Sequence, residues 1–239
     1  MAGSKVLVFG GTGPAGNCLL RELLHRNHQT LAYARNTAKI PNDLKENPLL
    51  EVVQGELGDA DAVAAATFQA RVIISLLGPN TIRGFEPSTY TDFYRVLFGA
   101  MRQHGVKRIF AMGTLSIADP DDVFSLKRLF IVGLVRTVVN PAYQLITAVG
   151  RLFVDEAHDL DWTVYRIAGI PGGSDEASWK QDREDGETFE GYVGQQGWTA
   201  SQKRGALTRW LVDAVEDGKT RWIRKMPAIS RLAGSVEHA

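Results

Sequence analysis

A glycine-rich segment follows the first apolar stretch of the chain. Residues 10–16 read Gly-Gly-Thr-Gly-Pro-Ala-Gly, which fits G-x-G-x-x-G from Gly11 and G-x-x-G-x-x-G from Gly10. In such a turn, one glycine permits a tight bend, one lets the backbone approach a pyrophosphate, and one lets the helix pack against the strand. The free N–H groups and the positive end of the helix then attract phosphate, and a proline is tolerated in the first helical turn. We therefore expect a dinucleotide at Gly10, Thr12, Gly13, Pro14, Ala15 and Gly16, the alternative being a tight turn with an empty site.

The end of the second apolar segment predicts which dinucleotide binds. A site that prefers NAD usually carries Asp or Glu about 20 residues after the glycines, where it binds the ribose hydroxyls. No acidic residue occurs between Leu23 and Asn42, and the segment ends instead at Arg35 and Asn36. Because a guanidinium grips phosphate with two hydrogen bonds, we expect NADP(H), with its 2′-phosphate at Arg35. The alternative role of Arg35 is that of a solvated loop cation.

Two further segments end at positions that a nucleotide could reach. Gly55-Glu56-Leu57 follows the third apolar stretch, and Ser75 to Asn80 ends the fourth. Ligands of open α/β sheets bind at the carboxyl ends of the strands. We expect Glu56 and Leu57 near the adenine and Leu76, Leu77 and Gly78 near the nicotinamide ribose, although turn chemistry alone also explains the glycines.

Alternating strands and helices are needed to position these residues. Short apolar runs predict strands, and leucines or aromatics three and four residues apart predict helices. The expected strands cover residues 5–9, 29–34, 50–54, 71–77, 106–112 and 162–168, and the expected helices 17–26, 59–67 and 86–104. This order predicts an α/β protein with a Rossmann-type doubly wound parallel sheet.

The second half of the chain has a different pattern. Residues 120–159 are apolar and helical, broken once at Asn140-Pro141, and residues 169–197 read as a loop with a short strand near 189–193. A closing helix is expected at 200–217 and an edge strand at 221–224. We therefore expect one NAD(P)-binding domain over residues 1–239, with a small, mostly helical substrate lobe built from about 115–160 and 170–239.

Composition excludes several classes of function. The 239 residues hold 27 Lys plus Arg and 27 Asp plus Glu, so no strong field favours nucleic acid. Cys18 is the one cysteine, and the five histidines lack ligand spacing, so we expect no disulfide framework and no metal. The longest apolar run, residues 129–135, is far shorter than the about 20 residues that span a bilayer. We expect a cytoplasmic protein without a signal peptide, with a homodimer or membrane-surface role possible at residues 129–139.

The quoted segments, together with residues 105–109 and 160–166, resemble the atypical short-chain dehydrogenase/reductase superfamily in its NmrA-like, NAD(P)H-binding branch. The pattern looks closest to uncharacterised fungal members. The resemblance implies a Rossmann domain that binds NADP(H). It does not fix a reaction, because this branch contains reductases, isomerases and redox-sensing regulators without activity.

The usual catalytic residues of that superfamily are incomplete. They comprise a Ser or Thr after the fifth strand and a Tyr-x-x-x-Lys motif, and this chain has no such motif. Thr114 is the expected hydroxyl, with Ser116 as a substitute, and Tyr143 is the expected proton donor, with Thr147 and Arg151 on the same helix face. The alternatives are a capping role for Thr114 and a partly buried helix aromatic for Tyr143.

Arg166 and the aromatic residues of the second half each have two interpretations. In the family, the backbone after this arginine lies beside the nicotinamide, so Arg166 is either a cofactor-site residue or a structural ion pair. Phe124, Phe130, Tyr143 and Phe153 either line an apolar pocket or belong to the core.

A phenol without a neighbouring lysine keeps its proton at neutral pH, which favours reduction over oxidation. We therefore expect an NADPH-dependent reductase of a small, largely apolar or aromatic carbonyl or conjugated compound, with secondary metabolism as one setting for it. The alternatives are a non-catalytic NADP(H) sensor and a redox-neutral isomerase or cyclase.

Overall fold

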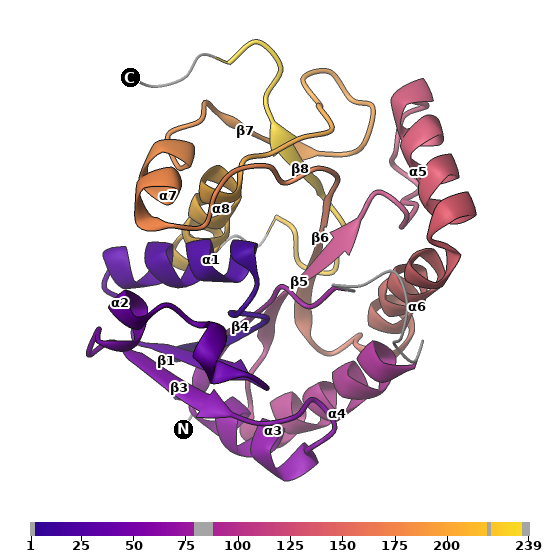
Figure 1. Cartoon of the computed structure of the whole chain (residues 1–239). Coiled ribbons are helices and arrows are strands. Elements are labelled where there is room, and N and C mark those ends of the chain that lie inside the picture. Colours follow the sequence, from indigo (N-terminus) through magenta and orange to yellow (C-terminus); the bar gives the residue numbers. More distant parts are fainter. Residues whose placement is uncertain (1–2, 79–87, 219–220, 236–239) are drawn as a thin grey trace.

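A single mixed sheet organises the chain. The computed structural model describes residues 3–78, 88–218 and 221–235, in which eight strands pair in the order β3-β2-β1-β4-β5-β6-β8-β7 (Figure 1). All neighbours are parallel except the β7–β8 pair. The strands are β1 (Lys5–Phe9), β2 (Thr30–Ala34), β3 (Leu50–Gln54), β4 (Ala70–Ser75), β5 (Arg108–Thr114), β6 (Asp161–Ile167), β7 (Thr188–Gly191) and β8 (Ala228–Arg231). The order reverses between β1 and β4, which confirms the predicted Rossmann-type sheet.

Helices cover both faces of this sheet. Helices α1 and α8 lie together on one face, and α3, α4 and α6 lie on the other (Figure 1). The helices are α1 (Pro14–His25), α2 (Asn42–Lys45), α3 (Ala60–Phe68), α4 (Thr89–His104), α5 (Leu126–Val138), α6 (Asn140–Glu156), α7 (Glu176–Asp182) and α8 (Arg204–Glu216), with a short 3-10 turn at Thr37–Lys39.

The two faces of β1 explain why its sequence is apolar throughout. Leu7 and Phe9 point into the core beneath α3, α4 and α6, whereas Val6 and Val8 point into the core beneath α1 and α8. All four side chains are fully buried. Alternation of the side chains across a strand therefore requires apolar residues at every position when both faces are covered.

The C-terminal half is helical, as expected, but it also extends the sheet. The edge strand predicted at residues 221–224 is wrong: those residues form a turn, and the strand is β8, which pairs with both β6 and β7. The predicted loop at 169–197 contains the short helix α7, which Asp175 caps by accepting a hydrogen bond from the Ser178 N–H at 2.9 Å. The break predicted at Asn140-Pro141 is the boundary between α5 and α6.

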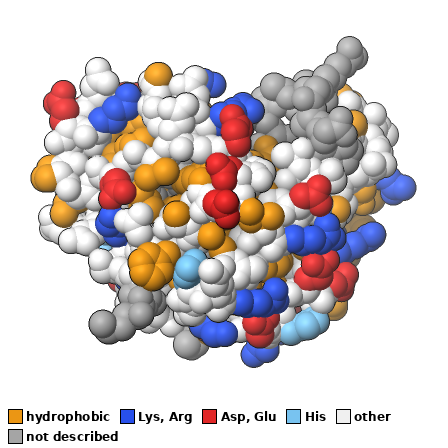
Figure 2. Space-filling view, turned by 90° about the horizontal axis from the view of Figure 1, so that it is seen from below, with side chains coloured by type: hydrophobic (Ala, Val, Ile, Leu, Met, Phe, Trp, Pro, Cys, Tyr) orange, Lys and Arg blue, Asp and Glu red, His pale blue; other side chains and the backbone are white. Residues whose placement is uncertain are grey.

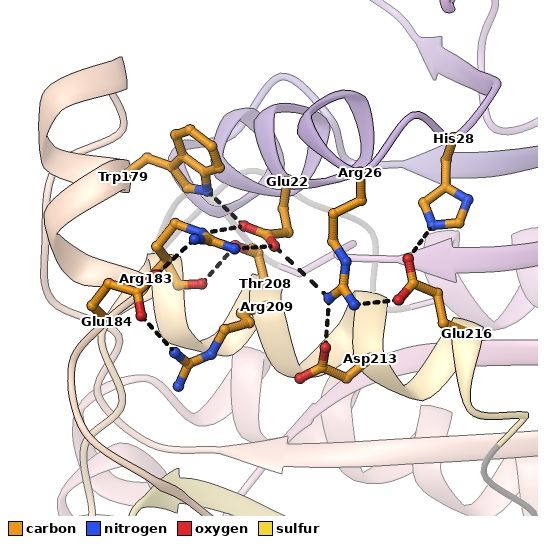
Figure 3. Close-up of polar contacts among 11 residues, drawn as sticks. Glu22, Arg26, His28, Trp179, Arg183, Glu184, Thr208, Arg209, Asp213 and Glu216 are labelled. Atoms are coloured by element: carbon orange, nitrogen blue, oxygen red, sulfur yellow. Dashed lines mark hydrogen bonds and ion pairs between the residues drawn. The ribbon is translucent and has the colours of Figure 1, made fainter. Parts of the chain in front are cut away.

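A buried ionic network ties α1 to the C-terminal helices (Figure 3). The fully buried Glu22 carboxylate accepts hydrogen bonds at 3.1 Å from Trp179 Nε1, Arg183 Nε and Arg183 Nη2. One turn further along α1, Arg26 pairs with Asp213 and Glu216 of α8. Buried charges are stable only when they are paired in this way. The network therefore fixes α7 and α8 against the helix that follows the glycine-rich turn.

Candidate functional site

The glycine-rich turn has three positions with distinct geometric demands. Gly10 has a φ of +83°, and a Cβ there would lie 2.9 Å from the Leu76 carbonyl carbon. A Cβ at Gly16 would lie 2.2 Å from the Gly10 oxygen, so only glycine lets α1 approach the turn. At Gly13 the nearest atom would be 3.7 Å away, so the protein itself leaves space there. The glycines that the structure requires are therefore those of the G-x-x-G-x-x-G spacing from Gly10. A Cβ added at Gly11 would make only ordinary contacts of 3.4 Å or more.

The first turn of α1 is open to an anion. Its N-cap residue Gly13 has no side chain to satisfy the helix, Pro14 lacks an N–H, and no acidic residue lies in the first turn. The N–H groups of Ala15 and Gly16 lie in the turn that has no intrahelical acceptors, at the positive end of the helix dipole. Thr12 is half-buried beside them. The space at Gly13 and the free helix end together fit a dinucleotide diphosphate.

Arg35 is placed at the same edge of the sheet, directly after β2. Its side chain is exposed, and no acidic side chain among residues 3–78, 88–218 and 221–235 forms an ion pair with it. The next residue, Asn36, uses its side-chain oxygen to cap the 3-10 turn, accepting from the Ala38 N–H at 3.1 Å. A guanidinium without a protein partner is available to a phosphate.

Tyr90 of α4 joins this edge and was not among the predicted site residues. Its hydroxyl donates to the Gly78 carbonyl oxygen at 3.0 Å. Burial raises the pKa of Tyr90, and the nearby charge of Arg35 partly offsets that rise. Tyr90 therefore contacts the segment that ends β4, on the side where the charge of Arg35 is felt. The aromatic spacing of this helix indicates only a core role, so no pattern in the sequence points to this contact.

The segments after β3 and β4 reach the same edge. Tyr33 donates from its hydroxyl to the Glu56 carbonyl oxygen at 2.8 Å, and the Glu56 side chain itself is exposed. Leu76 is buried, Leu77 is half-buried against the core, and Gly78 lies beside Met112. The rest of the predicted segment, Pro79 and Asn80, lies outside the described residues. The strand ends thus bring Glu56 and Leu57 to one side of the turn and residues 76–78 to the other.

The predicted hydroxyl pair follows β5. Thr114 ends the strand half-buried, and its Oγ1 accepts a hydrogen bond from the Ser116 N–H at 3.2 Å. This is the capping role considered for Thr114. Ser116 is buried and lines a cavity, whereas Thr114 is not among the lining residues.

That cavity has a volume of about 600 Å³ and lies between the loop after β5 and α6. Tyr143, Thr147 and Arg151 line it together, so these residues share one face of α6 as their spacing predicts. Acidic and basic side chains both line the cavity, and Trp162 and Met226 are among its apolar lining residues. The lining residues are Ser116, Ile117, Ala118, Asp119, Pro120, Asp121, Tyr143, Thr147, Gly150, Arg151, Val154, Asp155, Trp162, Arg224, Lys225 and Met226.

The expected aromatic lining is correct for Tyr143 alone. Phe153 is fully buried in the core between α4, α6 and β6. Phe124 and Phe130 are 78% and 74% exposed, so they neither line the cavity nor belong to the core. Phe153 therefore has the core role that was its alternative interpretation, whereas Phe124 and Phe130 have neither of the two roles considered for them.

The side chain of Arg166 forms the structural ion pair that was one of its two interpretations. Its side chain is fully buried, and its Nη1 and Nη2 donate to the two carboxylate oxygens of Asp122 at 2.6 and 2.7 Å. Nε donates to the Met226 carbonyl at 2.6 Å, and Nη1 also donates to that of Ile117 at 3.0 Å. With every nitrogen engaged by protein, the guanidinium holds the loop after β5 against β6 and the chain entering β8.

The comparisons with known proteins agree with the geometry of the turn. A family model described as NAD(P)H-binding matches residues 10–217. The chain belongs to this NAD(P)H-binding family. Its relatives include a 3 beta-hydroxysteroid dehydrogenase/Delta 5-->4-isomerase of Mycobacterium tuberculosis, 34% identical over 115 residues that cover 46% of this chain and 28% of the relative. An isoflavone reductase homolog of Zea mays is 29% identical over 180 residues, covering 71% of this chain and 50% of the relative. The chain thus spans half or less of the length of these two relatives.

Solved structures of low sequence identity share this fold. A short-chain dehydrogenase/reductase from Veillonella parvula in complex with NADP has a TM-score of 0.70 at 16% identity, covering 99% of this chain and 98% of that one. A putative epimerase from Bacteroides thetaiotaomicron has a TM-score of 0.71 at 20% identity, covering 99% of both chains. The predicted closeness to fungal members stays a prediction.

Proposed function

We propose that the protein is an NADPH-dependent reductase of small, largely apolar carbonyl or conjugated compounds. The proposal rests on the position of Arg35 directly after β2. Its side chain is exposed, and no acidic side chain in the described part of the chain pairs with it. An NAD-preferring site would carry a carboxylate there, and a carboxylate would repel a 2′-phosphate. The solved relative from Veillonella parvula was crystallised with NADP.

The glycine-rich turn and Arg35 divide the binding of the cofactor between them. The N–H groups at the start of α1 receive the diphosphate, and Arg35 receives the 2′-phosphate. Glu56 and Leu57 lie toward the adenine, and Leu76 to Gly78 lie toward the nicotinamide ribose. When bound, the cofactor supplies a hydride.

Tyr143 is the proton donor in this proposal. The Tyr143 hydroxyl would donate its proton to the carbonyl oxygen of the substrate, and Ser116 would orient the substrate. Thr147 stands where the usual lysine would be, and the cation beside the phenol is instead Arg136 of α5, whose guanidinium carbon lies 5.9 Å from the Tyr143 ring centroid. The cavity volume of about 600 Å³ is in the range that drug-sized ligands occupy. The names of the steroid dehydrogenase/isomerase and isoflavone reductase relatives both refer to polycyclic, largely apolar compounds.

The test is NADPH consumption, followed at 340 nm with a panel of quinones, enones and aldehydes. We expect steady turnover with at least one class, and a kcat reduced by about 100-fold in Tyr143→Phe because general acid catalysis is lost. Tyr192→Phe is the matched control, since Tyr192 does not line the cavity. Bound NADPH without consumption across the panel would refute the reductase.

One observation favours a second candidate, an NADP(H)-binding regulator without turnover. No described residue lines both the cavity and the nucleotide edge, and the Thr114 hydroxyl is already engaged with Ser116. The third candidate, a redox-neutral isomerase, draws on the second activity named for the mycobacterial relative. Product formation without net loss of NADPH would identify it.

A further inference from the structure

Helix α5 presents an apolar stripe to solvent. No residue of this helix is buried. Large apolar side chains recur three and four residues apart on its outward side and in the segment just before it. This stripe consists of Phe124 (78% exposed), Leu126 (71%), Leu129 (62%), Phe130 (74%), Leu134 (54%) and Val138 (63%). Contiguous exposed apolar surface of this kind marks an interaction site in most proteins.

The opposite side of α5 is firmly held. Ile131 and Val132 pack against a small cluster that includes Leu115 and Val193. Arg128 donates from Nε to the Leu115 carbonyl at 3.1 Å, and Ser125 caps the helix by accepting from the Arg128 N–H at 3.3 Å. The stripe therefore faces away from the body of the protein on a fixed support, at the side where α5 stands apart from the sheet (Figure 1).

The charges of α5 itself have one sign, and the exposed Asp121 lies three residues before Phe124. Lys127 and Arg136 are exposed, and helical spacing places them at its two edges. Residues 123–154 contain Lys127, Arg128, Arg136 and Arg151 but no Asp or Glu, in a chain whose net charge is zero. The face formed by α3 and α4 differs, since acidic and basic side chains alternate there with scattered apolar ones (Figure 2). There Arg95 pairs with Glu156 and Arg102 with Asp159.

We propose that α5 docks in the plane of an anionic phospholipid bilayer. An apolar stripe bordered by Lys and Arg enters the boundary between headgroups and acyl chains while its cations meet anionic headgroups. The helix lies on the bilayer rather than crossing it, because thirteen residues extend only about 20 Å. Within the described residues, no single helix is both long and apolar enough to cross, and α5 and α6 meet at a bend of 116°.

A second copy of the chain is the poorer occupant. Two α5 helices packed against each other would bring Lys127 and Arg136 of both copies together, and α5 itself has no carboxylate to separate them. Like charges across an interface oppose association. One helix of this length also offers less than the roughly 800 Å² per partner that stable dimers bury. The inference does not depend on the proposed reductase activity.

Vesicle flotation of the full chain tests the proposal. The vesicles contain either phosphatidylcholine alone or phosphatidylcholine with about a third phosphatidylserine, and the variants are Leu129→Ser/Phe130→Ser and Lys127→Gln. We expect stronger binding to the anionic vesicles, at least about tenfold weaker binding in the double variant, and about fivefold weaker binding to anionic vesicles in Lys127→Gln. Phe68→Ser is the matched control, since Phe68 is 56% exposed on α3 and should bind like the wild type.

Three results would overturn the proposal. The first is that the protein binds neither kind of vesicle. The second is that Phe68→Ser weakens vesicle binding as much as the double variant does. The third is that the protein binds no vesicles and light scattering shows a dimer that the substitutions of the double variant dissociate. The last result would assign the stripe to a second copy. Circular dichroism of each variant shows whether it is folded. Because Lys127 is exposed, Lys127→Gln tests the charge contribution without changing any apolar side chain.

Discussion

Replacing Asp122 by alanine removes one partner of the buried ion pair that holds the loop after β5. The Arg166 side chain is fully buried and that of Asp122 is 5% exposed, so water does not replace the lost carboxylate. The guanidinium loses acceptors at 2.6 and 2.7 Å. The N–H groups of Asp119 and Val193 lose acceptors at 3.0 and 3.1 Å.

Leaving one charge of a buried pair without its partner costs about 3–5 kcal/mol. We therefore expect the free energy of unfolding of Asp122→Ala to fall by that amount. For a chain of this size, the corresponding fall in Tm is roughly 6–20 °C. Urea unfolding and calorimetry at pH 7 measure both quantities. Asp121→Asn is the control, because Asp121 is exposed in the same loop.

The same pair predicts a pH dependence. Burial alone would raise the pKa of Asp122, but hydrogen bonds and charge from Arg166, with backbone N–H groups, lower it below its ordinary value. A carboxyl with a lowered pKa stabilises the fold above about pH 4 and loses that contribution as the pH falls further. The difference between wild type and Asp122→Ala should therefore shrink in acid. A loss below about 1 kcal/mol at pH 7, or a difference that grows in acid, would refute this account of the pair.

Three further predictions concern other positions. Gly13→Ala should keep wild-type stability, because the added Cβ would lie 3.7 Å from its nearest neighbour, yet it should bind NADPH at least about tenfold more weakly. Gly16→Ala should bind NADPH weakly and also unfold more easily, so equal thermal stability of the two variants would contradict this prediction. Cys18 is buried, and burial raises the pKa of its thiol to about 11. At pH 8 this thiol should therefore react with iodoacetamide far more slowly in the native protein than in the urea-unfolded protein, and equal rates would refute its burial. Glu22→Gln should lower the free energy of unfolding by about 2–4 kcal/mol, while Glu184→Gln, at a carboxylate whose side chain is 43% exposed, should change it by less than about 1 kcal/mol.

The sequence predicted the elements whose pattern is local. The apolar runs of β1, β4 and β6 and the glycine turn were found because each is encoded within ten residues and buried on both faces. Helix α7 and strand β8 were missed because neither has a sufficient local pattern. β8 is defined by its pairing with β6 and β7, which come from distant segments.

The part of the candidate site that lies at the carboxyl ends of the strands could be predicted from the sequence. Topology alone brings Arg35, Glu56 and residues 76–78 to one edge, and the structure shows this arrangement. The partnership of Arg166 with Asp122 joins residues 44 positions apart, so no spacing rule could choose between its two interpretations. Phe124 and Phe130 were expected to line a pocket or to belong to the core, and both are exposed; the surface role considered for residues 129–139 agrees with the exposure of Phe130.

Calorimetric titration with NADPH and NADH tests the central claim that the glycine turn and Arg35 together hold NADP(H). Wild type should bind NADPH more tightly than NADH, and Arg35→Ala should lose about 1–3 kcal/mol of NADPH affinity with little change for NADH. Lys39→Ala, at an exposed cation four residues further on, should leave both affinities unchanged. Failure to bind either nucleotide, or equal losses for both in Arg35→Ala, would contradict the account.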